Sequence, residues 1–127
     1  MRGISRNFFV LALLYALAGM ALGLFMAISQ DHSEMPTHAH IMVAGWLMSS
    51  VFAFFYHLFP GVAQTRLATV HFWLTAASGV TLVTGLFFLL GGHEAIEPLV
   101  AAASMTFYAA MFLFVVVAFP VIRGSTA

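Results

Sequence analysis

Six histidines stand out in a chain that is otherwise poor in ionisable side chains. Three of them, His38, His40 and His57, lie in the stretch MPTHAHIMVAGWLMSSVFAFFYHLFP of residues 35–60, and His71 lies in the apolar stretch that follows. Ionisable groups inside a membrane are costly and mark a functional site by default. Because neutral imidazole is a good ligand for metal ions and for heme iron, these histidines predict a metal or cofactor site.

The composition places these histidines in a membrane protein. Of the 127 residues, 63% are hydrophobic and only 6% are charged, far from the balance of a soluble domain. The chain has no cysteine, which excludes disulfides, iron–sulfur ligation and thiolate catalysis, so metal binding would rest on His, Met, Tyr or carboxylate. A net charge of zero argues against a nucleic-acid partner. No phosphate loop, zinc-protease motif or Ser-His-Asp order occurs, so hydrolytic catalysis is not favoured.

Four apolar stretches are long enough to cross a membrane, since a span needs about 20 apolar residues. They cover residues 7–29, 36–59, 67–90 and 96–121. Because the connections are short, we expect one all-α transmembrane domain over residues 1–127, a bundle with an up-down-up-down order. The first stretch is too long for the apolar region of a signal peptide, and we expect it to stay as a helix.

The charged residues predict the orientation of this bundle. All the arginines fall on one side of it and all the acidic residues on the other. By the positive-inside rule, both termini and the connection of residues 61–66 should be cytoplasmic. The arginines are Arg2, Arg6, Arg66 and Arg123, and the acidic residues are Asp31, Glu34, Glu94 and Glu97.

His38 and His40 lie in the first turn of the second predicted span, directly after Pro36, which suits a helix start. The positive end of the helix dipole disfavours imidazolium and so favours the neutral, ligating form. Residues two apart on a helix point about 200° apart, so one of the pair would bind a cofactor while the other faces elsewhere. A copper or zinc site at this outer end, with His32, Met35, His38 and His40 as ligands and Glu34 as a further donor, is the alternative.

His57 and His71 flank the predicted cytoplasmic hairpin almost symmetrically, so neighbouring antiparallel helices would carry them at similar depth. They could form a hydrogen-bonded pair or a second metal or heme site. A regular helix would separate His57 from His40 by about 25 Å, so the two ends cannot share one small metal site. His93 falls in an outer connection and reads as a solvated loop residue.

A heme would need one or two axial ligands and a large apolar slot. Gly45, Trp46 and Phe52 of the second span could line such a slot. Gly19 and Gly23 form a Gly-xxx-Gly pair in the first span, which predicts close helix packing within or between subunits, or room for a flat cofactor.

The second span resembles helix II of the catalytic subunit of the heme-copper oxidase superfamily, above all in C-type cytochrome oxidases and bacterial nitric oxide reductases. The resemblance rests on THAH at residues 37–40, GW at residues 45–46 and FYHLFP at residues 55–60. It implies that His38 is an axial ligand of a low-spin heme b near the outer face of the membrane. It also implies a bacterial inner membrane and a possible respiratory-chain partner.

The resemblance stops short of a complete oxidase. One copy of this chain lacks the histidines of a binuclear centre, so reduction of oxygen or nitric oxide by a monomer is not expected. The family's subunit is arranged as pseudo-symmetric arcs of four helices. The resemblance therefore implies a homotrimer that imitates the whole subunit, or a dimer that holds heme between two copies of His38.

Three functions follow as hypotheses. The first is a b-type heme protein for electron transfer, heme handling or gas sensing, and the second is a copper or zinc binding protein for oxidase assembly or metal transport. The third is a structural subunit of a larger respiratory complex, in which the histidines lie at the membrane interface and bind no cofactor. The predicted cofactor-binding residues are His38, His40, Gly45, Trp46, His57 and His71.

Overall fold

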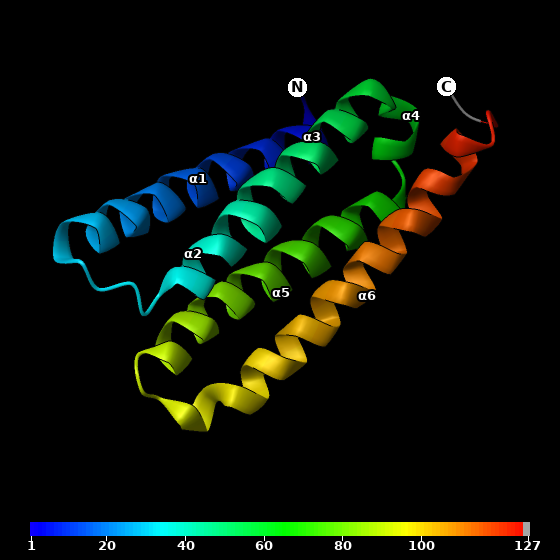
Figure 1. Ribbon diagram of the computed structural model, residues 1–127. Helices are drawn as coiled ribbons and strands as arrows, with labels where there is room; N and C mark the ends of the chain where they lie inside the picture. Colours follow the sequence, from blue (N-terminus) through cyan, green and yellow to red (C-terminus); the bar gives the residue numbers. More distant parts are fainter. Residues whose placement is uncertain (126–127) are drawn as a thin grey trace.

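The computed structural model describes residues 1–125, which form a set of long helices joined by short connections (Figure 1). The second long helix is continuous but is built from three segments, α2, η1 and α3. The elements are α1 (Gly3–Ser29), α2 (Met35–His40), η1 (Ile41–Leu47), α3 (Met48–Leu58), α4 (Pro60–Ala63), α5 (Arg66–Leu90), η2 (Glu94–Ile96) and α6 (Glu97–Ile122).

All the elements of residues 1–125 except α4 join into four continuous helices that are long and apolar enough to cross a membrane. This finding confirms the predicted all-helical class and the four predicted spans. Their bounds are Gly3–Ser29, Met35–Leu58, Arg66–Leu90 and Glu94–Ile122. The largest difference from the sequence prediction is at the first helix, which begins at Gly3 rather than at residue 7. Nothing in residues 3–6 interrupts a helix, because a charged Arg6 ends an apolar run without ending helical geometry.

Local sequence explains where the helices begin and end. Pro36 and Pro60 each occupy the first turn of a helix, where the missing N–H costs nothing. Thr65 caps α5, because its hydroxyl oxygen accepts a hydrogen bond from the Ala68 N–H at 3.2 Å. Gln30 ends α1 in a left-handed conformation with φ of 59°.

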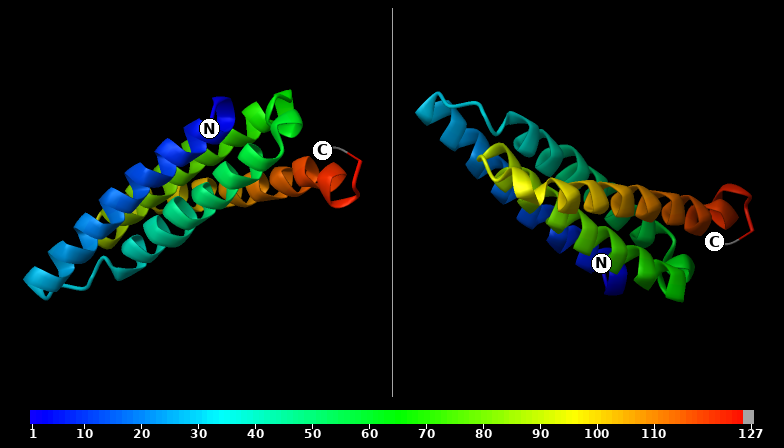
Figure 2. Two further views of the ribbon diagram at one scale, coloured as in Figure 1. Left: turned by 90° about the horizontal axis from the view of Figure 1, so that it is seen from above. Right: turned by 90° about the horizontal axis from the view of Figure 1, so that it is seen from below.

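The helices lie side by side along one long axis (Figures 1 and 2). Helix α1 packs against the second span, α5 contacts both of them, and α6 packs mainly against α5. Both labelled termini lie at the same end of the molecule as α4, and the connections between α1 and α2 and between α5 and α6 lie at the other (Figures 1 and 2). The four arginines therefore occupy one end, and the four acidic residues occupy the other.

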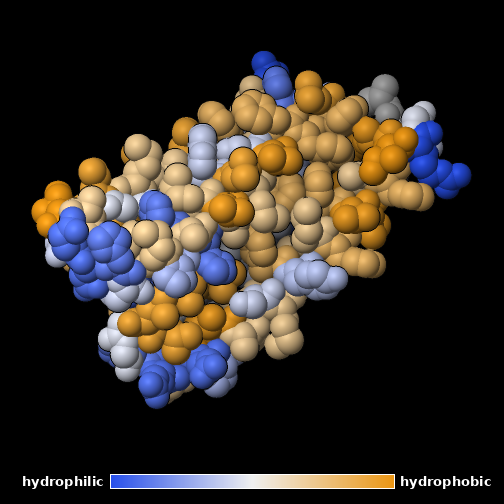
Figure 3. Space-filling view, in the orientation of Figure 1, coloured by the Kyte–Doolittle hydropathy of each residue, from blue (hydrophilic) through white to orange (hydrophobic). Residues whose placement is uncertain are grey.

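An apolar surface separates these two ends. In Figure 3, hydrophilic residues gather at the ends of the bundle and hydrophobic residues cover its middle. Large apolar side chains such as Leu17, Met105 and Phe112 are exposed there. An outward-facing apolar band of this kind is the expected surface of a helical bundle in lipid.

Segment η1 is π-helical, with more residues per turn than an α-helix. Buried positions in this part of the second span recur at every fourth residue, at Thr37, Ile41, Gly45 and Ser49. At about 3.6 residues per turn, that spacing would drift steadily around the helix. The wider π turn keeps these residues on the face that packs against neighbouring helices.

An aromatic core fills the arginine-bearing half of the bundle. Its buried members include Phe8 from α1, Phe52 and Tyr56 from α3, Phe72 from α5 and Val117 from α6. The ring of Phe8 lies 5.3 Å from that of Phe52 and 5.0 Å from that of Phe72, between ring centroids. Contacts from every span thus fix the surroundings of one buried histidine, His71.

Candidate functional site

His38 is held by a hydrogen bond to the backbone of α1. Its ring Nδ1 lies 2.8 Å from the carbonyl oxygen of Gly19. A carbonyl oxygen only accepts, so Nδ1 carries the proton and donates it, and in the neutral ring Nε2 keeps a free lone pair. The side chain is partly buried. This arrangement gives His38 one fixed tautomer with the nitrogen that ligates metals left unprotonated.

Glycines of α1 make the approach of His38 possible. A Cβ atom on Gly23 would lie 3.0 Å from Cε1 of the His38 ring, and one on Gly19 would overlap the sulfur of Met42. The Gly19/Gly23 face is therefore a close contact between two spans of the same chain. Close packing within the subunit, one of the readings left open by the sequence, is the one that the structure supports, and this face is not free for a second subunit.

His40 faces away from this contact. Its side chain is exposed, and its Nδ1 donates to the carbonyl oxygen of Pro36 at 2.7 Å. His38 and His40 therefore bond to different backbone groups, as their spacing on a helix requires. The Nε2 atom of His40 is left on the outer surface of the bundle.

The predicted outer metal cluster does not assemble within one chain. His32 and Met35 are both exposed, and Nδ1 of His32 bonds the carbonyl oxygen of Gln30 at 3.2 Å. Residues 1–125 contain no group of three or more His, Asp or Glu side chains placed to hold a metal ion. The ligand set of His32, Met35, His38 and His40 therefore has no geometric support in the single chain.

His71 is completely buried in the aromatic core. Its Nδ1 lies 2.9 Å from the hydroxyl of Tyr56, and its Nε2 has no hydrogen-bond partner among the described residues. The rings of Phe52 and Phe114 lie 4.7 Å and 5.2 Å from the His71 ring, between centroids. The unpaired nitrogen of His71 is therefore buried within the aromatic core.

His57 does not hydrogen-bond with His71. It is exposed, whereas the preceding residue, Tyr56, is buried, and both residues line a pocket at the arginine-bearing end. Sequence reasoning paired the two imidazoles by their depth and missed Tyr56. One residue along a helix changes direction by about 100°, so only one of two adjacent side chains can face the core.

The proposed slot near Gly45 is filled by a side chain of the same chain. A Cβ atom on Gly45 would overlap the ring of Tyr15, which α1 places against it. Trp46 is partly buried, and its carbonyl oxygen accepts a hydrogen bond from the Ser50 hydroxyl at 2.7 Å. Phe52 belongs to the aromatic core. Within one chain, the Tyr15 ring therefore occupies the space beside Gly45.

Comparison with protein families, curated proteins and solved structures finds no match to this chain.

Proposed function

We propose that this chain is a b-type heme-binding membrane protein in which His38 is an axial ligand through Nε2. The hydrogen bond from Nδ1 of His38 to the Gly19 carbonyl carries the proposal. Histidines that ligate metals almost always donate their other ring N–H to a carbonyl, a carboxylate or water, which fixes the ring and raises its basicity. His38 has this feature, and the likeness of residues 35–60 to helix II of heme-copper oxidases points to the same residue.

The heme would lie between chains rather than inside one. Tyr15 fills the space beside Gly45, and aromatic rings enclose His71, so the interior of a single bundle offers no slot. A second copy would supply the other axial ligand, His38 of a dimer or a neighbouring residue of a trimer. Bound heme supplies one-electron exchange or gas binding, which fits electron transfer, heme handling or gas sensing.

We also infer how the protein is oriented. The arginines gather at the end that carries both termini, so this end faces the cytoplasm and the four spans run up-down-up-down. The His38 site then lies near the outer face of the membrane. The family resemblance favours a bacterial inner membrane and a respiratory-chain partner.

Copper or zinc binding remains a second function because of one observation. The His40 side chain is exposed, and its Nδ1 donates to the Pro36 carbonyl oxygen. Its Nε2 is therefore left unprotonated and able to bind a metal ion, as in His38. A metal ion could then be held between the His40 side chains of neighbouring copies. This function needs an oligomer, since one chain lacks a cluster of ligands.

An absorption spectrum of the full chain, purified in mild detergent and measured before and after dithionite, tests the proposal. We expect a Soret band with sharp reduced α and β bands. His38→Ala should abolish them, whereas His93→Ala, which changes another outer histidine bonded to a backbone carbonyl, should leave them intact. A colourless protein that contains copper or zinc would instead support the second function.

Cross-linking of the same sample tests the shared heme. We expect dimers or trimers whenever the heme is bound by two histidines. Heme with two histidine ligands in a protein that cross-links only as a monomer would contradict the interface site.

A further inference from the structure

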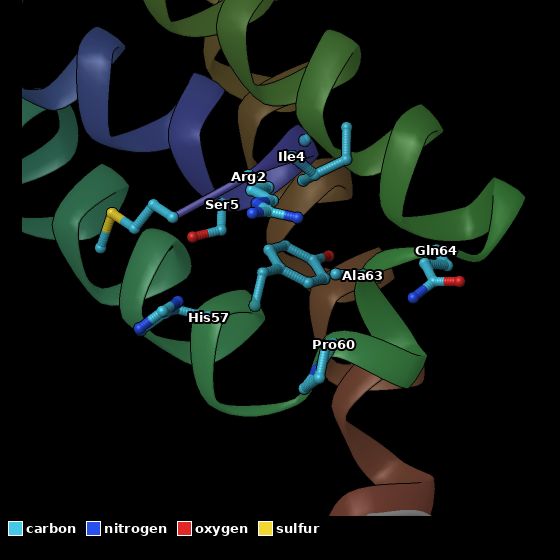
Figure 4. A pocket seen from close by; sticks show the side chains of 10 residues that line it. Arg2, Ile4, Ser5, His57, Pro60, Ala63 and Gln64 are labelled. Carbon is cyan, nitrogen blue, oxygen red and sulfur yellow. The ribbon is translucent and has the colours of Figure 1, made fainter.

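A pocket of about 480 Å³ lies at the arginine-bearing end of the bundle. Its walls come from the first turn of α1, the end of α3 and the short helix α4 (Figure 4). Arg2, Ile4 and Ser5 form one wall, and His57, Pro60 and Gln64 lie across from them (Figure 4). The pocket is unrelated to the His38 site, which is near the opposite end of the second span.

The start of α1 offers this pocket a set of unpaired backbone donors. The first four N–H groups of a helix have no partner within the helix, and the helix dipole adds partial positive charge there. The residue that precedes α1, Arg2, makes no side-chain capping hydrogen bond. A helix start of this kind is suited to binding an anion.

Ser5 gives a second and independent sign of a missing ligand. The residue lines the pocket and is only 2% exposed, and its buried hydroxyl has no hydrogen-bond partner among the described residues. An unpaired buried hydroxyl costs about 1–3 kcal/mol, so a bound acceptor would remove that cost. An anionic oxygen is the strongest acceptor for such a group.

The charged residues around the pocket favour a negatively charged ligand. Arg2 lines the pocket, and no carboxylate side chain is among its lining residues in the described part of the chain. The acidic side chains Asp31, Glu34, Glu94 and Glu97 all lie at the far end of the bundle, beyond the reach of these groups. His57 and Gln64 add further side chains that can donate hydrogen bonds.

We propose that this pocket binds the phosphate group of an anionic phospholipid from the adjacent leaflet. The pocket lies at the end of membrane-crossing helices, where lipid headgroups gather, and basic residues there attract anionic lipid. Its volume lies within the range of about 300–1,000 Å³ that is usual for small-ligand sites. Ile4, Pro60 and Ala63 provide apolar walls for the glycerol and the first part of the acyl chains.

Native mass spectrometry of the full chain tests this proposal through the apparent affinity for phosphatidylglycerol and for phosphatidylcholine. We expect phosphatidylglycerol to bind more tightly. Arg2→Gln should weaken its binding about fivefold, as expected for one basic residue at the membrane surface. Arg6→Gln removes the same charge one turn further along α1, outside the pocket, and should have a smaller effect.

Ser5→Ala separates binding from folding. It should weaken phosphatidylglycerol about tenfold, because a hydrogen bond to a charged group is lost. In lipid-free detergent it should leave the melting temperature unchanged or raised, since it deletes an unpaired buried hydroxyl. Ser104→Ala, which removes a hydroxyl that bonds the Val100 carbonyl on α6, is the matched control and should not alter lipid binding.

Equal affinity for the two lipids, or equal losses in Arg2→Gln and Arg6→Gln, would overturn the proposal. Displacement of phosphatidylglycerol by inorganic phosphate would show that free phosphate is the ligand, which also overturns the lipid assignment. These outcomes do not depend on heme, because the measurement reads only bound lipid.

Discussion

Replacing Tyr56 by phenylalanine removes the only hydrogen bond that the buried His71 side chain makes within residues 1–125. The Tyr56 hydroxyl and Nδ1 of His71 lie 2.9 Å apart, and Nε2 is already unpaired. In Tyr56→Phe both ring nitrogens of His71 would be buried without a partner. The surrounding rings of Phe8, Phe52 and Phe114 offer no polar atom in exchange.

Two known energy ranges set the expected loss of stability in Tyr56→Phe. Leaving a buried polar group unpaired costs about 1–3 kcal/mol in proteins generally. Side-chain hydrogen bonds between membrane helices average about 0.6 kcal/mol and reach about 1.7 kcal/mol, because the unfolded chain in a micelle also finds partners. Since Tyr56 is 1% exposed and His71 is 0% exposed, we expect Tyr56→Phe to lower the free energy of unfolding by about 1–2 kcal/mol.

Equilibrium unfolding in mixed micelles, driven by increasing SDS, measures this loss. Tyr108→Phe is the matched control, because the Tyr108 side chain is 75% exposed and its hydroxyl has no buried partner. It should change stability by less than about 0.5 kcal/mol, as surface substitutions do. The double variant Tyr56→Phe, His71→Phe should recover part of the loss, since replacing both partners by apolar groups of similar shape is nearly neutral.

Two results would refute this reasoning. A Tyr56→Phe variant as stable as the wild type would mean that the hydroxyl contributes nothing to the folded bundle. A double variant less stable than the sum of the two single variants would mean that the aromatic core, rather than the hydrogen bond, sets the role of His71.

Two further predictions concern the other end and the middle of the bundle. Gly45→Ala should lower the free energy of unfolding by about 1–3 kcal/mol, because the new Cβ atom would overlap Cβ and Cγ of Tyr15, which lie next to the Tyr15 backbone and cannot easily move. Unchanged stability in the SDS titration would contradict this close contact. The backbone N–H of Ser33 donates to Asp31 and lowers the pKa of its carboxyl below the ordinary value of 3.8. The turn is therefore stabilised above pH 3.8 and loses this stabilisation as the pH falls through the lower folded-state pKa, which an NMR titration of the Asp31 carboxyl would show. A midpoint at or above 3.8 would contradict the bond.

The helices of this protein could be predicted from sequence because their signals are local. Long apolar runs set the number of spans, and prolines such as Pro36 and Pro60 set where helices begin. The bounds differed mainly at Gly3, because hydropathy measures the apolar run and not the helix that extends beyond it. The π-helical segment was not predicted, because its spacing becomes visible only when burial is known.

The partners of the histidines could not be predicted in the same way. His38 bonds a backbone carbonyl of Gly19, and every residue type carries a carbonyl, so no sequence pattern marks it. His71 bonds Tyr56 rather than the adjacent His57, because the phase of the helix decides which neighbour faces inward. Sequence reasoning found which residues were unusual, and the packing of α1 against the second span decided what each one touches.

The π turn in η1 gives the second span a property that a uniform α-helix lacks. A π turn holds one extra residue, so the same residues wound as a regular α-helix would rotate one end of the span about 100° against the other. The His38 bond to Gly19 and the Tyr56 bond to His71 sit on opposite sides of that joint, and a regular helix would misalign one of them. The π turn thus sets the angle between the two ends of the span, so that His38 faces Gly19 on α1 while Tyr56 faces His71 on α5.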